Sequence, residues 1–197
     1  MRKGVLDRLS EITLEEQQLL QNGPLDMSLY NRAGGSMVET SSLLPKGELF
    51  GIRTHTRFVD FPRHSHNYVE MIYQVQGKTC HRINGITELT LEAGQILFLG
   101  RGTEHAIKAA GQEDIAVNFI LIPTFFDNAA ISLGGSNALS VFLKGNLKTN
   151  QAMSGHLVFD IHGADMIENL LENLVLGQME GIGLNIQQMT LELLLQH

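Results

Sequence analysis

Between residues 48 and 122 the chain alternates short runs of strand-forming residues with glycine-rich turns, and this alternation constrains the fold more than any other feature. The dipeptide Asn84-Gly85 separates two such runs and predicts a type I′ hairpin, because both residues tolerate a positive φ. Short strands at this spacing form antiparallel sandwiches or small barrels. We therefore predict strands at residues 48–60, 67–76, 79–83, 86–91, 95–99, 104–109 and 114–122.

The two ends of the chain have sequence patterns that are typical of helices. Thr13-Leu-Glu-Glu16 is a capping box within residues 1–21, so we expect one or two short helices there. Apolar residues recur every three or four positions over residues 164–175, which predicts an amphipathic helix, and a second apolar helix begins near Leu184. With one more strand expected at 156–161, the predicted fold is mainly β, with two C-terminal α-helices.

These changes in texture divide the chain into segments. The two apolar helices offer more hydrophobic surface than one small sheet covers, so we predict a homodimer through residues 164–197, with Ile167, Leu170, Leu171 and Leu174 at its interface. The last helix stops in a leucine-rich turn without a cap, and we expect the chain to be part of a longer protein. The predicted segments are an N-terminal helix and arm at 1–47, a β-barrel core at 48–122, a connecting segment at 123–163 and a helical linker or dimerisation segment at 164–197.

Composition excludes several classes of protein. The chain has 14 Lys and Arg against 21 Asp and Glu, a net charge of −7, and no Lys or Arg beyond residue 148, which is the wrong sign for a surface that binds DNA phosphates. The single cysteine, Cys80, cannot form an intrachain disulfide and favours a reducing, cytoplasmic location. There is no apolar stretch long enough for a membrane span, so we expect no membrane association.

The segment Pro62-Arg-His64-Ser-His66-Asn-Tyr-Val-Glu70 carries the strongest chemical signal. Alternate side chains of a strand share a face, so the two imidazoles and the carboxylate can point into a barrel together. His105, after a glycine-rich turn, can join from a neighbouring strand. Three neutral nitrogens and one carboxylate suit a borderline divalent ion such as Zn, Fe, Ni or Mn. The predicted metal ligands are His64, His66, Glu70 and His105.

These residues resemble the two cupin motifs. His64-x-His66-x3-Glu70-x6-Gly77 matches the second half of the first motif, and Gly94-x5-Gly100-x-Gly102-x2-His105 is similar to the second. The sequence departs from the pattern at Phe58, where the first motif has glycine, and at Gly100 and Ala109, where the second has proline and asparagine. The resemblance implies a cupin-like antiparallel β-barrel, the double-stranded β-helix or jelly roll.

The surrounding residues look most like the sensor domain of AraC-type transcription regulators, over roughly residues 48–122. The terminal helices resemble that family's helical linker and dimerisation segment. The residues that carry this likeness are Arg57-Phe58-x-x-Phe61-Pro62-Arg63-His64-Ser65-His66 and Tyr68-x-Glu70-Met71-x-Tyr73-x-x-x-Gly77.

The resemblance implies that the chain binds a small-molecule effector in its barrel, dimerises, and controls a DNA-binding region that is absent from this sequence. Alternatives are a metal-dependent cupin enzyme (a dioxygenase, isomerase or decarboxylase acting on a small acid) and a free-standing binding or storage module. In a metal-free sensor the His-x-His pair hydrogen-bonds inside the barrel, and Glu70 pairs with a cation such as Arg82. The residues predicted to line the pocket are His64, His66, Tyr68, Glu70, Ile72, Arg82 and His105.

Overall fold

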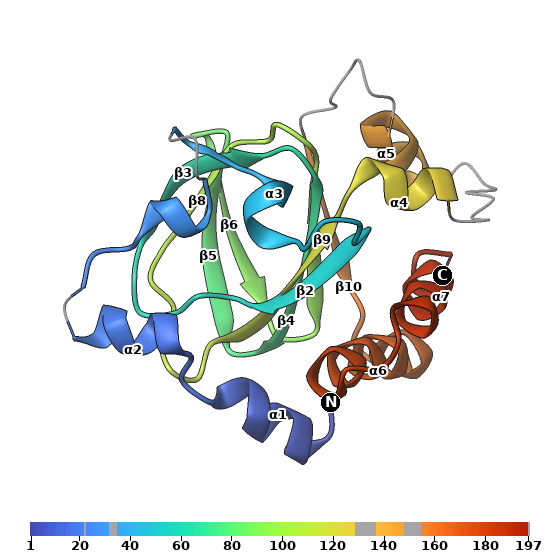
Figure 1. The fold of residues 1–197 in the computed structure, drawn as a ribbon, viewed down its shortest axis with the longest axis horizontal. Coiled ribbons are helices and arrows are strands. Elements are labelled where there is room, and N and C mark those ends of the chain that lie inside the picture. The colour runs from blue at the N-terminus through green and yellow to red at the C-terminus, as the bar shows by residue number, and fades with distance from the viewer. Residues whose placement is uncertain (22, 32–34, 129–136, 148–154, 197) are drawn as a thin grey trace.

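The computed structural model describes residues 1–21, 23–31, 35–128, 137–147 and 155–196, and its centre is a pair of five-stranded β-sheets that face each other (Figure 1). One sheet has the order β1-β3-β8-β5-β6 and the other β10-β7-β4-β9-β2. All pairings are antiparallel except that of β1 with β3. The strands are β1 (Met37–Val38), β2 (Phe50–Thr54), β3 (Phe61–His66), β4 (Val69–Gln76), β5 (Lys78–Ile83), β6 (Thr87–Glu92), β7 (Gln95–Leu99), β8 (His105–Ile107), β9 (Ile115–Leu121) and β10 (His156–Asp160).

Helices lie outside this pair of sheets, which we call the barrel. α6 and α7 lie together beside the sheet that contains β10, and α1 lies next to α6 (Figure 1). None of the helices in the described part of the chain is long and apolar enough to cross a membrane. The helices are α1 (Lys3–Ser10), α2 (Leu14–Leu20), α3 (Thr40–Leu43), α4 (Pro123–Asn128), α5 (Ala138–Leu147), α6 (Asp165–Glu180) and α7 (Leu184–Leu194), with a 3-10 turn at Met27–Leu29.

Two turns show how local residue chemistry shapes the barrel. Asn84 and Gly85 have φ of 52° and 71°, and Ile86 N donates to Ile83 O at 3.1 Å, which is the predicted type I′ hairpin between β5 and β6. Phe58 has φ of 71°, in the left-handed region that disfavours a residue with a Cβ. This is the position where the first cupin motif has glycine, so the backbone keeps the motif's turn although the side chain has changed.

Strand alternation separates two apolar cores. Along β4, Met71 and Tyr73 face outward into a large core that includes the C-terminal helices, whereas Ile72 faces inward. The inner core consists of Ile72, Ile83, Leu91, Leu97, Leu99 and Ala116 and fills one end of the barrel interior. The other end contains the polar side chains described below. The fold is the predicted one, mainly β and cupin-like, with two C-terminal helices.

The apolar stripe of α6 is covered within the chain. Leu171 and Leu174 are 0% exposed and pack in the outer core, which also contains Val5 and Leu9 of α1. The expectation that a partner must cover this stripe is therefore wrong for these two leucines, because α1 and the outer sheet face cover them. The predicted connecting segment includes residues 129–136 and 148–154, which lie outside the described residues.

Candidate functional site

Three strands bring the predicted metal ligands together at the polar end of the barrel. His64 and His66 alternate along β3 and face inward, and His105 of β8 is the pairing partner of His64. Glu70 enters from β4 in the opposite sheet. His66 Nε2 lies 3.0 Å from His105 Nε2, and Glu70 Oε2 lies 3.4 Å and 3.6 Å from these two nitrogens. One nitrogen from each of the three histidines lies within 4.8 Å of the others.

The donor set fits a divalent ion. His64 Nδ1 donates to Pro62 O at 2.8 Å, which leaves Nε2 with its lone pair, and an outer acceptor of this kind orients a ligand imidazole. Glu70 Oε2 is buried without a hydrogen-bond partner among the described residues, so it is available as a ligand atom. His66 Nδ1 and His105 Nδ1 are likewise buried without such a partner. Two of the three imidazoles thus lack the outer acceptor of His64.

Asn118 and His55 orient the carboxyl group of Glu70. Asn118 Nδ2 donates to Glu70 Oε1 at 3.0 Å, and Asn118 Oδ1 lies 3.2 Å from His55 Nδ1. Because an amide oxygen only accepts, His55 donates from Nδ1. This chain directs Glu70 Oε2 toward His66 and His105. Burial raises the pKa of Glu70 to about 8, although the hydrogen bond from Asn118 and the charge of Arg53 lower it.

Histidines 55 and 81 are site residues that sequence reasoning missed. His81 is buried in the barrel interior, with its ring centroid 5.9 Å from that of His105 and its Nε2 2.9 Å from Thr79 Oγ1. The alternation of β5 could have identified it, because Thr79, His81 and Ile83 share the inward face. No sequence spacing connects His55 to the motif, because His55 directly follows β2, an edge strand of the other sheet. Burial lowers the pKa of both imidazoles.

Four of the seven predicted pocket residues, His66, Ile72, Arg82 and His105, do not line the cavity described next, whereas His64, Tyr68 and Glu70 do. Arg82 has the opposite parity to His81 and lies exposed on the outer face, where its Nε donates to Glu88 Oε1 at 2.7 Å. It therefore does not pair with Glu70, which receives its hydrogen bond from Asn118. Ile72 faces inward but belongs to the apolar inner core and does not line the cavity described next.

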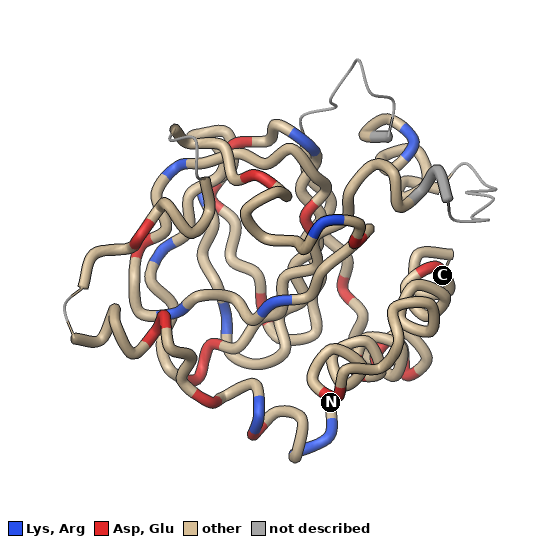
Figure 2. Tube along the Cα trace, viewed as in Figure 1, with Lys and Arg blue, Asp and Glu red and all other residues tan. Residues whose placement is uncertain are grey.

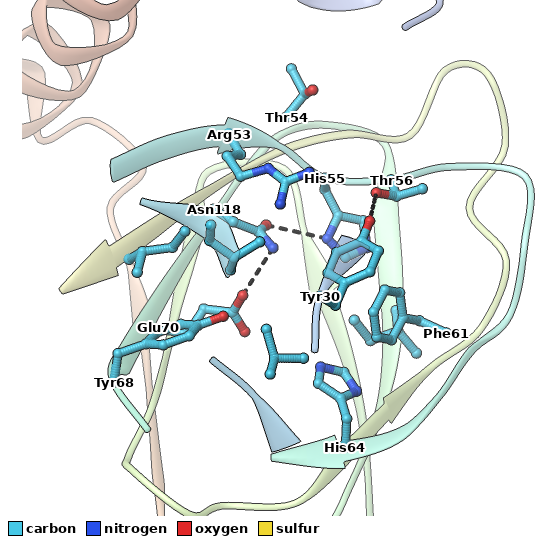
Figure 3. A pocket seen from close by; sticks show the side chains of 14 residues that line it. Tyr30, Arg53, Thr54, His55, Thr56, Phe61, His64, Tyr68, Glu70 and Asn118 are labelled. Carbon is cyan, nitrogen blue, oxygen red and sulfur yellow. Dashed lines mark hydrogen bonds between the residues drawn. The ribbon is translucent and has the colours of Figure 1, made fainter. Parts of the chain in front are cut away.

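A cavity opens between the barrel and the N-terminal segment (Figure 3). Its volume is about 50 Å³, which is room for a few water molecules or a small ligand group. One part of its wall is polar and comes from the barrel and from Tyr30, and another part is apolar. Its lining residues are Tyr30, Val38, Leu43, Arg53, Thr54, His55, Thr56, Phe61, His64, Tyr68, Glu70, Ile107, Asn118 and Ile120. His64 and Glu70 belong both to this wall and to the histidine cluster, so the cluster adjoins the cavity.

Solved structures that resemble parts of this chain have low sequence identity. An apo variant of ToxT from Vibrio cholerae is 12% identical, with a TM-score of 0.48 over 76% of this chain and 54% of that one. Wild-type ToxT bound to an unsaturated fatty acid is 13% identical, with a TM-score of 0.43 over 73% and 52%. A cupin-2 domain protein from Shewanella frigidimarina is 22% identical, with a TM-score of 0.30 over 36% and 66%. This chain spans about half the length of the ToxT chains.

No curated protein matches the sequence. The model of the AraC-like ligand-binding domain matches residues 46–188, which cover both sheets except β1, together with α6 and the start of α7. This match extends over well more than half of the chain, and the chain therefore belongs to the family of AraC-like ligand-binding domains.

Proposed function

We propose that this chain is the effector-sensing and dimerisation domain of an AraC-type transcription regulator. The observation that carries the proposal is the cavity at the junction of barrel and N-terminal segment, where polar side chains converge next to an apolar wall, as in small-molecule sites. Family membership favours a sensor over the alternative of a metal-dependent cupin enzyme. α6 and α7 carry no Lys or Arg, so these two helices lack the cations that bind DNA phosphates (Figure 2).

The N-terminal segment provides a route from the cavity to the C-terminal helices. Tyr30 forms part of the cavity wall and donates from its hydroxyl to Glu15 Oε1 of α2 at 2.6 Å. α1, which precedes α2, packs on α6, where Arg2 N donates to Glu172 Oε2 at 3.0 Å and Arg8 donates to Met179 O at 3.2 Å. An effector that binds one arrangement of this segment better than another would shift the position of α6.

Ligand binding in the cavity is expected to raise the melting temperature. A ligand at one hundred times its dissociation constant adds about 2.7 kcal/mol, which is roughly 5–10 °C for a domain of this size. Thermal shift measurements over a library of small acids, sugars and aromatic compounds test this expectation. Ile107→Phe fills the cavity wall and should abolish the shift, whereas Val141→Phe, at an exposed position on α5, should preserve it. Equal shifts in both variants would place the ligand elsewhere.

A divalent ion at the histidine cluster is a second proposal, supported by the convergence of His64, His66, Glu70 and His105. Bound there, the ion would supply a Lewis acid beside the cavity. We expect about one equivalent of Zn, Fe, Ni or Mn by elemental analysis of the purified protein, and a reduction of at least tenfold in His105→Ala. His162→Ala, at an exposed position, is the matched control. Metal-free protein that takes up no added ion would contradict this assignment.

We also propose that the chain forms a homodimer within residues 164–197, through the exposed face of α7. Ile186 and Met189 are 61% and 69% exposed, and Leu193 lies on the same side of the helix. A second copy that presents the same stripe covers it by two-fold symmetry. Met189→Glu is expected to yield a folded monomer in sedimentation at micromolar concentration, whereas Gln188→Glu should remain dimeric. A monomeric wild-type chain would contradict the dimer.

The division of the chain and its location remain part of this proposal. Residues 1–47 would act as the arm, 48–122 as the barrel, 123–163 as the connection and 164–197 as the dimerisation segment. The single cysteine supports a cytoplasmic location.

A further inference from the structure

Among the described residues that line the cavity, Arg53 is the one lysine or arginine. It faces inward from β2, paired across the sheet with Asn118, and Figure 3 shows its guanidinium at the rim, near Tyr30 and Asn118. Burial raises the pKa of both Tyr68 and Glu70, and the positive charge of Arg53 opposes this rise. The guanidinium carbon lies 5.4 Å from the centre of the Tyr30 ring, which also lines the cavity.

The anion that faces Arg53 comes from outside the cavity. Glu15 of α2 places Oε2 3.8 Å from the Arg53 guanidinium and receives a 2.6 Å hydrogen bond from Tyr30 on Oε1. Thr56 Oγ1 lies 3.0 Å from the Tyr30 hydroxyl and completes this group at the mouth. Arg53 and Tyr30 thus form a carboxylate site, and Glu15 occupies it from the solvent side.

This contact leaves most of the binding capacity of Arg53 unused. A guanidinium binds a carboxylate best through two parallel hydrogen bonds, whereas Glu15 makes one long contact to a side chain that is 37% exposed. Ion pairs of this kind contribute little and are easily displaced. A single guanidinium matches the two oxygens of one carboxylate.

We propose that the effector is a small monocarboxylic acid whose carboxylate displaces Glu15 from Arg53 and Tyr30. This inference rests on the proposed sensor function and names the ligand class of the same cavity. The apolar part of the acid would contact Val38, Leu43, Phe61, Ile107 and Ile120. Displacement of Glu15 acts on α2 and so reaches the route to α1 and α6 described above. Glu15 is in this sense an internal competitor of the effector.

The experiment compares acids with their uncharged counterparts. Butyrate, benzoate and octanoate, their primary amides, and neutral pentoses and hexoses are titrated into the chain and followed by NMR. At least one acid is expected to bind about tenfold more tightly than its amide, with shifts at cavity residues. Glu15→Gln keeps an acceptor for Tyr30 but removes the charge, and it should raise acid affinity three- to tenfold without changing amide affinity. Arg53→Met should remove the preference for the acid.

Glu11→Gln is the matched control, because it removes an exposed negative charge of the same N-terminal segment, four residues before Glu15. Acid affinity that is unchanged in Glu15→Gln, or that rises equally in Glu11→Gln, would overturn the competition. A cavity that binds an amide or a sugar as tightly as any acid would overturn the ligand class but leave the sensor function in place. Absence of binding by all three classes would count against both proposals.

Discussion

Glu16→Ala is expected to destabilise the chain by about 3–5 kcal/mol, because it leaves the charge of Arg57 buried without its partner. The two side chains are 3% and 1% exposed. Arg57 Nε donates to Glu16 Oε1 at 2.7 Å, and Arg57 Nη2 donates to Glu16 Oε2 at 2.9 Å. Burial alone would raise the pKa of Glu16, but the hydrogen bonds from Arg57 and Thr13 lower it below its ordinary value. Glu16 also closes the capping box of α2.

The expected loss is a large fraction of the 5–15 kcal/mol that stabilises a typical domain. Urea unfolding followed by circular dichroism measures it. Glu11→Ala, at an exposed position, should change stability by less than about 0.5 kcal/mol. The double variant Glu16→Met with Arg57→Met should recover most of the loss, because it removes both charges at once. A loss in Glu16→Ala no larger than that of Glu11→Ala would show that the pair does not hold α2 on the barrel.

Acidification of the metal-free chain is expected to unfold it below about pH 5. Burial lowers the folded-state pKa of the interior histidines, to about 4 for His64 and about 3 for His81, in each case together with nearby histidine charges. A histidine whose folded pKa lies below its unfolded value of 6.5 binds its proton more readily when unfolded. Its stabilising contribution is present above pH 6.5 and is lost as pH falls toward the folded pKa. For His64 alone this amounts to about 3 kcal/mol.

The titration of Glu70 changes the stability of the folded chain in the opposite direction. Its pKa is raised to about 8, so the folded chain holds its proton more tightly between pH 4.5 and 8 and loses that stabilisation as pH rises through 8. Stability measured by denaturant in the presence of a chelator should therefore peak between about pH 6 and 7. Glu70→Gln should remove the decline above pH 7 and retain the acid limb. Constant stability down to pH 4.5 would show that the interior imidazoles are not buried in neutral form.

Much of the barrel could be predicted from residues that act locally. Turn chemistry at Asn84-Gly85 and short apolar runs identified most strands to within a few residues, because the hairpins depend on near neighbours. The motif spacing likewise placed His64, His66, Glu70 and His105 in one group, which the structure brings within a few ångströms of each other. The argument that placed Glu70 on the same strand face as His64 and His66 was wrong, because Glu70 lies on β4 in the facing sheet.

What the sequence determined by itself is therefore the position of most strands, the turns and the chemistry of the central motif, since each rests on periodicity or on short-range backbone preference. The strands β1 and β3 were not predicted, although β3 carries His64 and His66. Only the tertiary structure decided which residues complete the site. His55, Asn118 and Arg53 join it through pairing between β2 and β9, and Tyr30 through the return of the N-terminal segment across the cavity. The inward face of β5 and the intramolecular burial of Leu171 and Leu174 were decided in the same way. These contacts join residues far apart in the chain, and a sequence pattern specifies a side chain's neighbours along its own element but not across the fold.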